Sequence, residues 1–213
     1  MYRSFLKRII GFIGALAAIV LLSPLFVVVI IWLHFANKGA GVFFFQNRIG
    51  RKEKPFKIIK FKSMTDEKGS DGMLLPDKDR LTKAGRFVRL TSIDELPQLI
   101  NILKGDMAFI GPRPLPPIYL PYYTEREAHR HDVRPGISGW AQVNGRKSIT
   151  WDHKLECDAY YVEHLTLWLD IKIFFLTVYK VFKRESVGVG TSGNISLYDV
   201  REVQRPEYVN RVQ

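Results

Sequence analysis

The longest uncharged stretch of the chain runs from Ile9 to Leu33, and it limits the folds that are open to this protein. At about 1.5 Å per residue, a helix over this range could cross a bilayer core of roughly 30 Å. A secretory signal peptide has a shorter apolar region, of about 7 to 15 residues, followed by a small-residue cleavage site. This run is longer and no convincing cleavage site follows it, so we predict a membrane segment.

Ser23 and Pro24 lie near the middle of this stretch, where proline removes a helical hydrogen bond and predicts a bend. Basic residues flank both ends: Arg3, Lys7, Arg8, Lys38, Arg48, Arg51, Lys52 and Lys54. Because positive flanks favour the cytoplasmic side, both ends are expected there. A kinked transmembrane helix is the alternative. We favour a re-entrant hairpin bent at Ser23-Pro24, with residues 1–38 as the membrane anchor.

The remaining composition fits one catalytic domain. A chain of 213 residues with 46% hydrophobic residues has material for one globular core and a membrane element. Its net charge of +11 indicates an anionic partner: nucleic acid, anionic lipid or a phosphorylated substrate. Cys157 is the single cysteine, which excludes an intramolecular disulfide and a cysteine-based metal cluster, and we interpret it as a packing residue.

The segments after the anchor predict a mixed α/β (α+β) fold with a short sheet. β-branched and aromatic runs at residues 42–46 and 56–62 indicate two strands around a turn, with Lys60 and Lys62 on one face if the second strand is regular. A solvated strand face is the alternative for those lysines. Residues 66–79 and 135–145 are expected to be loops. Helices are predicted at residues 96–103, 119–133, 151–164 and 165–182, the last either in the core or at the membrane interface. We assign residues 39–185 to the catalytic domain and residues 186–213 to a flexible tail.

Asp94 and Glu95 are the candidate catalytic residues. Ser92 followed by Glu95 matches a helix capping box, which would be a purely structural role. With Ser92 as the cap, however, Pro97 would fall beyond the first turn, where its missing N–H weakens the helix. A helix start nearer Leu96 fits Pro97 better and places both carboxylates beside the positive end of the helix dipole.

Two adjacent carboxylates repel a phosphorylated substrate unless a cation lies between the carboxylates and the phosphate. Mg²⁺ typically uses one or two carboxylates together with substrate phosphate oxygens, so Asp94 and Glu95 are also the candidate metal ligands. An ionised aspartate in this place can act as a nucleophile through an acyl-phosphate intermediate.

Arginines with restricted backbones follow the carboxylate pair. Arg113 lies between two prolines, which favours bidentate phosphate binding, although a rigid surface turn is the simpler interpretation of an isolated Pro-Arg-Pro. Residues 134–146 combine Arg134 and Arg146 with Trp140 and two amides. The arginines could bind phosphates, the tryptophan could stack on a base, and the amides could form hydrogen bonds with that base.

These motifs, in this combination and order, resemble the bacterial sugar transferases, in the short form of the monotopic phosphoglycosyl transferases. The resemblance runs from Lys7-Arg8 to about Arg184. Its strongest stretches are Ser23-Pro24 and residues 60–64, 91–98, 103–107, 111–114 and 134–146. Gly11 departs from the pattern, which has an aspartate there.

The resemblance implies a ping-pong transfer of sugar phosphate at the cytoplasmic face of the bacterial inner membrane. Asp94 would attack the β-phosphate of a UDP-sugar and release UMP, and polyprenyl phosphate, in this family undecaprenyl phosphate, would then accept the sugar phosphate. Glu95 would assist with Mg²⁺ or with protons. The implied substrate contacts are Lys60, Arg89, Arg113, Arg146 and the acidic Asp158. The step would begin the assembly of a glycoconjugate, with downstream glycosyltransferases as possible partners and the sugar left open.

Three other functions are weighed against this one. A non-catalytic basic module on a membrane anchor explains the charge, but not Asp94 and Glu95 among arginines. Nucleic-acid binding is disfavoured by the membrane segment and by the lack of a known recognition motif, so we expect no nucleic-acid partner. A phosphohydrolase that uses the same aspartate is chemically closer, because water would then resolve the intermediate.

Overall fold

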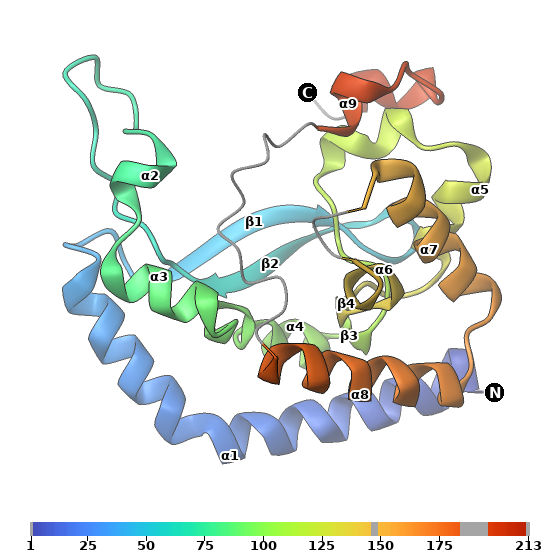
Figure 1. The fold of residues 1–213 in the computed structure, drawn as a ribbon, viewed down its shortest axis with the longest axis horizontal. Helices are drawn as coiled ribbons and strands as arrows, with labels where there is room; N and C mark the ends of the chain where they lie inside the picture. Colours follow the sequence, from blue (N-terminus) through green and yellow to red (C-terminus); the bar gives the residue numbers. More distant parts are fainter. Residues whose placement is uncertain (1, 146–148, 184–195, 212–213) are drawn as a thin grey trace.

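The computed structural model describes residues 2–145, 149–183 and 196–211. The fold is mixed α/β and mostly helical, with two small sheets, as the sequence predicted (Figure 1). The larger helices and the strands are α1 Lys7–Ala36, β1 Phe43–Ile49, β2 Pro55–Phe61, α3 Lys83–Leu90, α4 Gln98–Lys104, β3 Ala108–Ile110, β4 Gly136–Ser138, α7 Trp151–Glu163 and α8 Leu167–Phe182. The shorter helices are η1 Tyr2–Leu6, η2 Arg51–Glu53, α2 Asp77–Arg80, η3 Ile93–Glu95, η4 Pro117–Tyr122, α5 Glu125–Ala128, η5 His129–Asp132, α6 Trp140–Val143, α9 Leu197–Val200 and η6 Pro206–Arg211.

Helix α1 is the element of the described residues that is long and apolar enough to cross a membrane. It contains Pro24 and remains one continuous helix, with the Ser23 hydroxyl donating to the carbonyl of Val20 at 2.8 Å. Figure 1 shows it bent, with both ends rising toward the rest of the molecule. The expected bend is therefore present within one helix, whereas the two arms of a hairpin are not formed as separate helices.

Both halves of α1 pack on the same domain. In the first half, Ala15 is fully buried in a cluster with Leu99 and Ile102 of α4. In the second half, Leu33 is fully buried in a cluster with Val88 of α3 and Phe61 of β2. A straight helix that carried its second half across a bilayer could not keep both sets of contacts.

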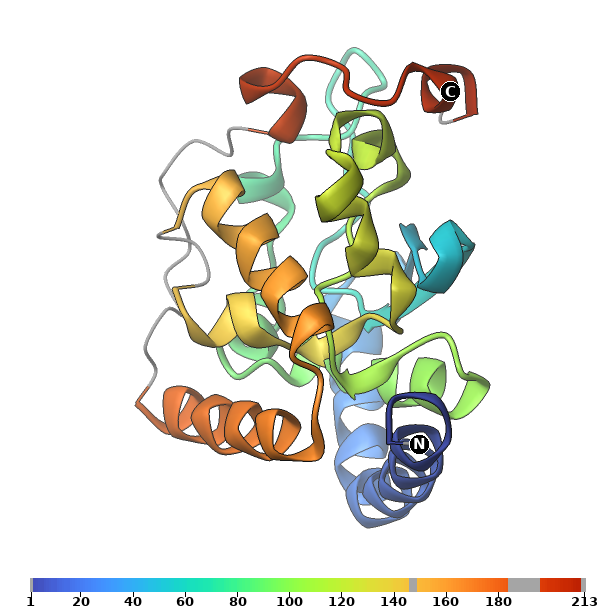
Figure 2. The ribbon, with the colours of Figure 1, turned by 90° about the vertical axis from the view of Figure 1, so that its right-hand side faces the viewer.

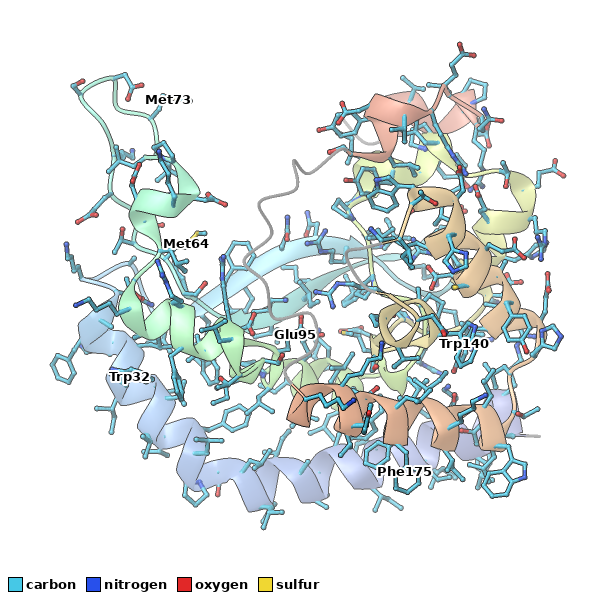
Figure 3. All side chains as sticks on the ribbon, viewed as in Figure 1. Trp32, Met64, Met73, Glu95, Trp140 and Phe175 are labelled. Carbon is cyan, nitrogen blue, oxygen red and sulfur yellow. The ribbon has the colours of Figure 1, made fainter. Side chains whose placement is uncertain are left out.

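Most of the α1 surface is nevertheless apolar and exposed. Leu21 is 79% exposed and Val20 is 66% exposed. Helix α8 lies at the same lower side of the molecule as α1 in both ribbon views (Figures 1 and 2). It buries Ile173 completely but leaves Trp168 and Phe175 exposed, and Figure 3 shows Phe175 on the lower side of the helix. The two helices together form an exposed apolar surface on one side of the protein.

The sheets hold the middle of the domain together. Strands β1 and β2 pair antiparallel, with Phe44 opposite Lys60, and each runs close to the expected range. Strands β3 and β4 pair in parallel, although the sequence predicted a loop where β4 and α6 form. The parallel pair depends on close backbone contact, because a Cβ on Gly136 would lie 2.1 Å from the backbone nitrogen of Gly111.

One further expectation, that of a single helix, is wrong. Residues 119–133 do not form one helix, because Pro121 interrupts the pattern and Thr124 caps a new helix through a capping box with Glu127. The described part of the expected flexible tail, residues 196–211, is folded onto the domain. Leu197 is fully buried in a cluster with Leu120 and Leu155, and Arg205 pairs with Glu53 at 2.5 Å. The domain boundaries themselves stay predictions.

Candidate active site

The carboxylate pair lies on η3, a single short turn between α3 and α4. Ser92 adopts a left-handed conformation (φ 57°), which ends the preceding helix, and its side chain caps nothing. Pro97 is the N-cap of α4, whose first residue is Gln98. The capping-box hypothesis for Ser92 is therefore wrong. The expectation based on Pro97 is confirmed to within two residues, and Asp94 and Glu95 lie just before the N-terminal end of α4.

A buried asparagine fixes α4 against β2. Asn101 has no exposed surface, and its side-chain amide accepts from the Ile59 N–H at 3.0 Å and donates to the Lys57 carbonyl at 2.8 Å. The same helix ends at Lys104, one residue beyond the predicted end, and is followed by Gly105, which is left-handed (φ 91°). Because Asn101 locks α4 to the strand that carries Lys60, it sets the distance between Lys60 and the carboxylates.

Lys60 and Arg113 converge on Glu95. The Lys60 ammonium lies 2.8 Å from Glu95 Oε1, and an Arg113 terminal nitrogen lies 2.9 Å from the same oxygen. Lys60 is also 3.8 Å from Asp94 Oδ2. Figure 3 shows Glu95 in the middle of the molecule, between β2 and the lower helices. The structure thus brings together four of the residues that the sequence predicted for the site: Lys60, Asp94, Glu95 and Arg113.

The two carboxyl groups differ in protonation behaviour. Burial alone would raise the pKa of Glu95, but the charges of Arg113 and Lys60 and their hydrogen bonds hold it at about 2. Burial raises the pKa of Asp94, and the neighbouring charge of Glu95 adds to this, while Lys60, Arg113 and Arg89 partly offset it. Among the described residues, no donor makes a hydrogen bond to Asp94. Glu95 is therefore a fixed anion, whereas Asp94 is the carboxyl group that the described residues leave without a hydrogen bond.

Arg113 is positioned from behind by a buried arginine that the sequence analysis missed. Arg130 is 3% exposed and donates to the Arg113 carbonyl at 2.7 Å, to Asp158 Oδ2 at 2.8 Å and to the Tyr123 hydroxyl at 2.9 Å. Arg130 lies in a run of charged residues at positions 125–132, and nothing in that run marks one member as buried.

Asp158, on α7, is connected to the site through Arg130. It is 4% exposed, and burial raises its pKa to about 6 even though Arg130 lowers it. Its second oxygen, Oδ1, is buried and has no hydrogen-bond partner among the described residues. A direct contact of Asp158 with substrate phosphate stays a prediction, because the contact that the structure gives is to Arg130.

Two other arginines lie near the site, Arg89 close to Asp94 and Arg48 close to Arg113. Arg89 donates to the Ser63 hydroxyl at 2.7 Å and is close enough to lower the pKa of Asp94. Arg48, which the sequence analysis treated only as a flanking charge, has its pKa lowered to about 10 by burial and then by Arg113. Arg146 lies outside the described residues.

The donor set suits a hard cation only in part. Within the described residues, no group of three or more His, Cys, Asp or Glu side chains gathers as metal ligands. Asp94 and Glu95 offer carboxylate oxygens on adjacent residues, and no hydrogen bond from the described part of the chain holds Asp94. This fits an ion such as Mg²⁺, which is commonly bound by one or two carboxylates with substrate phosphate completing the shell.

Comparison with known proteins identifies the class of protein. The profile of the bacterial sugar transferase family matches residues 2–184, and the chain therefore belongs to that family. It is 56% identical over 149 residues to the uncharacterized sugar transferase EpsL of Bacillus subtilis. The matched region covers 70% of this chain and 74% of that protein.

Two relatives have more specific names. The chain is 41% identical to the UDP-N-acetylgalactosamine-undecaprenyl-phosphate N-acetylgalactosaminephosphotransferase of Aeromonas hydrophila, with 82% of the chain and 43% of that protein covered. It is 38% identical to the UDP-glucose:undecaprenyl-phosphate glucose-1-phosphate transferase of Klebsiella pneumoniae, with 84% of the chain and 41% of that protein covered. The chain thus spans less than half the length of these two relatives.

Proposed function

We propose that this protein transfers a sugar 1-phosphate from a UDP-sugar to polyprenyl phosphate and releases UMP. The observation that carries the proposal is the contrast between Glu95, fixed by Lys60 and Arg113, and the adjacent Asp94, which accepts no hydrogen bond from a described residue. The names of the relatives, which give UDP-sugars as donors and undecaprenyl phosphate as acceptor, support the choice of substrates.

The transfer takes place in two displacements at phosphorus. An Asp94 carboxylate oxygen attacks the β-phosphorus of the UDP-sugar, and the bond from that phosphorus to the oxygen shared with the α-phosphate breaks. UMP leaves with that oxygen, and the sugar phosphate stays on Asp94 as an acyl phosphate. An oxygen of polyprenyl phosphate then attacks the same phosphorus, the bond to Asp94 breaks, and the carboxylate is restored.

The cations around the pair prepare it for an anionic donor. Lys60, 3.8 Å from Asp94, stabilises the ionised carboxylate and the negative charge that gathers on the phosphoryl oxygens. The Arg113 fork is 45% exposed, so it can bind phosphate while Glu95 holds one of its nitrogens. Arg89, and Arg146 as an expectation from the sequence, complete the set of phosphate contacts. When bound, Mg²⁺ at Asp94 and Glu95 would withdraw charge from the phosphate oxygens.

The packing of α1 supports a membrane position for the reaction. Because both halves of α1 pack on the domain, the exposed apolar surface of α1 and α8 lies on one side and can enter one leaflet without crossing the bilayer. The positive flanks favour the cytoplasmic face of the bacterial inner membrane. A single cysteine at Tyr2 or at Lys38, in a Cys157→Ser background, should be labelled only from the cytoplasmic side, and labelling of either from outside would refute this orientation.

The reaction is tested by UMP release from a panel of UDP-sugars, with and without polyprenyl phosphate and Mg²⁺. We expect Asp94→Asn to lower transfer by at least about a thousandfold, because the amide is a poor nucleophile. Asp79→Asn, which changes an exposed aspartate on α2, is the matched control and should keep full activity. Intact-mass analysis without acceptor should show the sugar phosphate on the wild-type chain and not on Asp94→Asn.

Two outcomes would overturn the proposal. Undiminished transfer by Asp94→Asn would remove the nucleophile. Equal and sustained UMP release without the lipid would instead indicate a phosphohydrolase, in which water resolves the intermediate.

A further inference from the structure

A second basic site lies away from the carboxylate pair. A cavity of about 170 Å³ opens between the N-terminal part of α1, the C-terminal end of α4 and the segment around Arg134. Its cationic lining residues are Arg3, Lys7, Arg8, Arg51 and Arg134. Asp94 and Glu95 precede the first turn of α4, so the length of that helix, about 10 Å, separates them from the cavity.

The positive charge of this cavity is mostly uncompensated. Lys7 is paired with Asp170 at 2.6 Å. Arg8, Arg51 and Arg134 instead donate to backbone carbonyls, those of Leu103 (2.7 Å), Asp132 (3.2 Å) and Gly105 (2.8 Å), respectively. Within the described parts of the chain, none of these three arginines has an ion pair with a carboxylate.

The arginine side chains are held so that donors remain available. Arg51 and Arg134 each use Nε for the backbone contact, and their terminal nitrogens make no hydrogen bond to a described residue. Burial and then the charges of Arg51 and Arg8 lower the pKa of Arg134, which agrees with the guanidinium groups lying close to one another. Asp132, the acidic side chain in the lining, is bound to His129 at 2.9 Å. An anion in this cavity would relieve the mutual repulsion of the arginines.

The surroundings of the cavity are those of a membrane interface. Ile10 and Ile13, on either side of the lining residue Gly11, are 49% and 61% exposed on the apolar surface of α1. Figure 2 shows the N-terminal end of α1 at the lower side of the molecule, next to α4, and Arg8 makes contacts with the last turn of α4. A charged headgroup at this point would have its acyl chains beside apolar side chains.

We propose that this cavity binds the phosphate of an anionic phospholipid headgroup and so anchors the N-terminal end of α1 at the leaflet surface. Its volume is below the roughly 300 Å³ at which pockets for drug-sized ligands begin, which suits a headgroup phosphate better than a nucleotide-sugar. Terminal guanidinium nitrogens are suited to bidentate phosphate binding. The inference rests on the membrane position of α1 proposed above, but not on the transfer reaction.

The test uses the full chain in detergent, offered an equal mixture of phosphatidylglycerol and phosphatidylcholine, with retained lipid counted by native mass spectrometry. The decisive pair is Gly11→Asp and Gly11→Asn. A Cβ at this position would meet only Ile102, at an ordinary 3.7 Å, so both variants should fold. The two side chains have nearly the same size, and only the aspartate supplies an internal anion to the arginines.

We expect the wild type and Gly11→Asn to retain phosphatidylglycerol selectively and Gly11→Asp to retain about tenfold less, the loss expected for one charge-assisted hydrogen bond or more. Arg51→Gln/Arg134→Gln should lose the lipid as well. Lys83→Gln/Lys180→Gln removes two charges from α3 and α8 and should retain it. Thermal unfolding of every variant, measured in parallel, separates lost binding from lost structure.

Three results would overturn the proposal: equal retention of both lipids by the wild type, equal retention of phosphatidylglycerol by Gly11→Asp and Gly11→Asn, or complete displacement of the lipid by excess inorganic phosphate. The last would identify a site for free phosphate instead. Because lipid retention is measured without substrate, the result does not depend on whether the chain transfers sugar phosphate.

Discussion

Replacing Asp158 by asparagine is expected to destabilise the protein more than replacing its partner Arg130 by methionine. Asparagine keeps the volume of the aspartate but leaves Arg130, which is 3% exposed, as a buried cation without a counterion. An arginine cannot lose its proton under these conditions. Burial also raises the pKa of Tyr123 to about 12, so this hydroxyl stays neutral and cannot balance the charge.

The magnitudes differ because only one partner can become neutral. Breaking a buried ion pair by removing its anion costs about 3–5 kcal/mol. In Arg130→Met, the remaining Asp158 can take up a proton at pH 5, because its pKa is already about 6 with the arginine present. The loss is then limited to hydrogen bonds, about 1–3 kcal/mol in all. The double variant Arg130→Met/Asp158→Asn should be more stable than Asp158→Asn alone.

The measurement is unfolding in denaturant at pH 5 in detergent, followed by circular dichroism, for the wild type, both single variants and the double variant. Glu156→Gln is the control on the same helix. Its partner Arg126 is exposed, and solvent screening leaves such pairs with little effect on stability. The reasoning fails if Arg130→Met is destabilised as much as Asp158→Asn, or if the double variant is the least stable of the set.

Three further changes test other parts of the structure. Because the pKa of Glu95 is lowered to about 2, the folded state binds this proton more weakly than the unfolded state, so wild-type stability should fall by about 3 kcal/mol as the pH drops from about 4.5 to about 2. Unfolding of Glu95→Gln across this range should lack that part of the slope. Asn101→Ala should cost about 2–4 kcal/mol in denaturant unfolding, because two partly buried backbone groups of β2 lose their partner. Gly85→Ala should destabilise the protein by about 2 kcal/mol or more and lower its melting temperature by several degrees, because the new Cβ would lie 1.8 Å from the Ser63 carbonyl oxygen. Gly11→Ala should leave the melting temperature unchanged, and equal effects of the two substitutions would contradict the packing argument.

The parts of the site that the sequence predicted depend on signals that act within a few residues. Pro97 fixes where α4 can begin, and the left-handed Gly105 fixes where it ends. The strand that carries Lys60 has an apolar and β-branched composition that predicts extended structure. These local rules placed Asp94 and Glu95 correctly beside the start of a helix, with no knowledge of tertiary contacts.

The parts that the sequence did not predict depend on contacts between distant segments. Strand β4 forms because Gly111 and Gly136 allow two backbones to meet, and a three-residue strand has too few side chains to show a period. Arg130 is buried by α7 and by the loop that carries Arg113, which lie elsewhere in the chain. The single helix expected at residues 119–133 is a different error, because Pro121 and the capping box at Thr124 were visible in the sequence.

The packing of α1 on later parts of the chain has a consequence for biosynthesis. The buried faces of this helix close on α4 and α3, which emerge from the ribosome only after it. Until then Ala15 and Leu33 have no partners, and the new helix is apolar on every side, as a membrane-spanning segment would be. If α1 enters the membrane as proposed, its final position is therefore decided by residues that are synthesised after it, and the completed domain must bring both of its ends to one side.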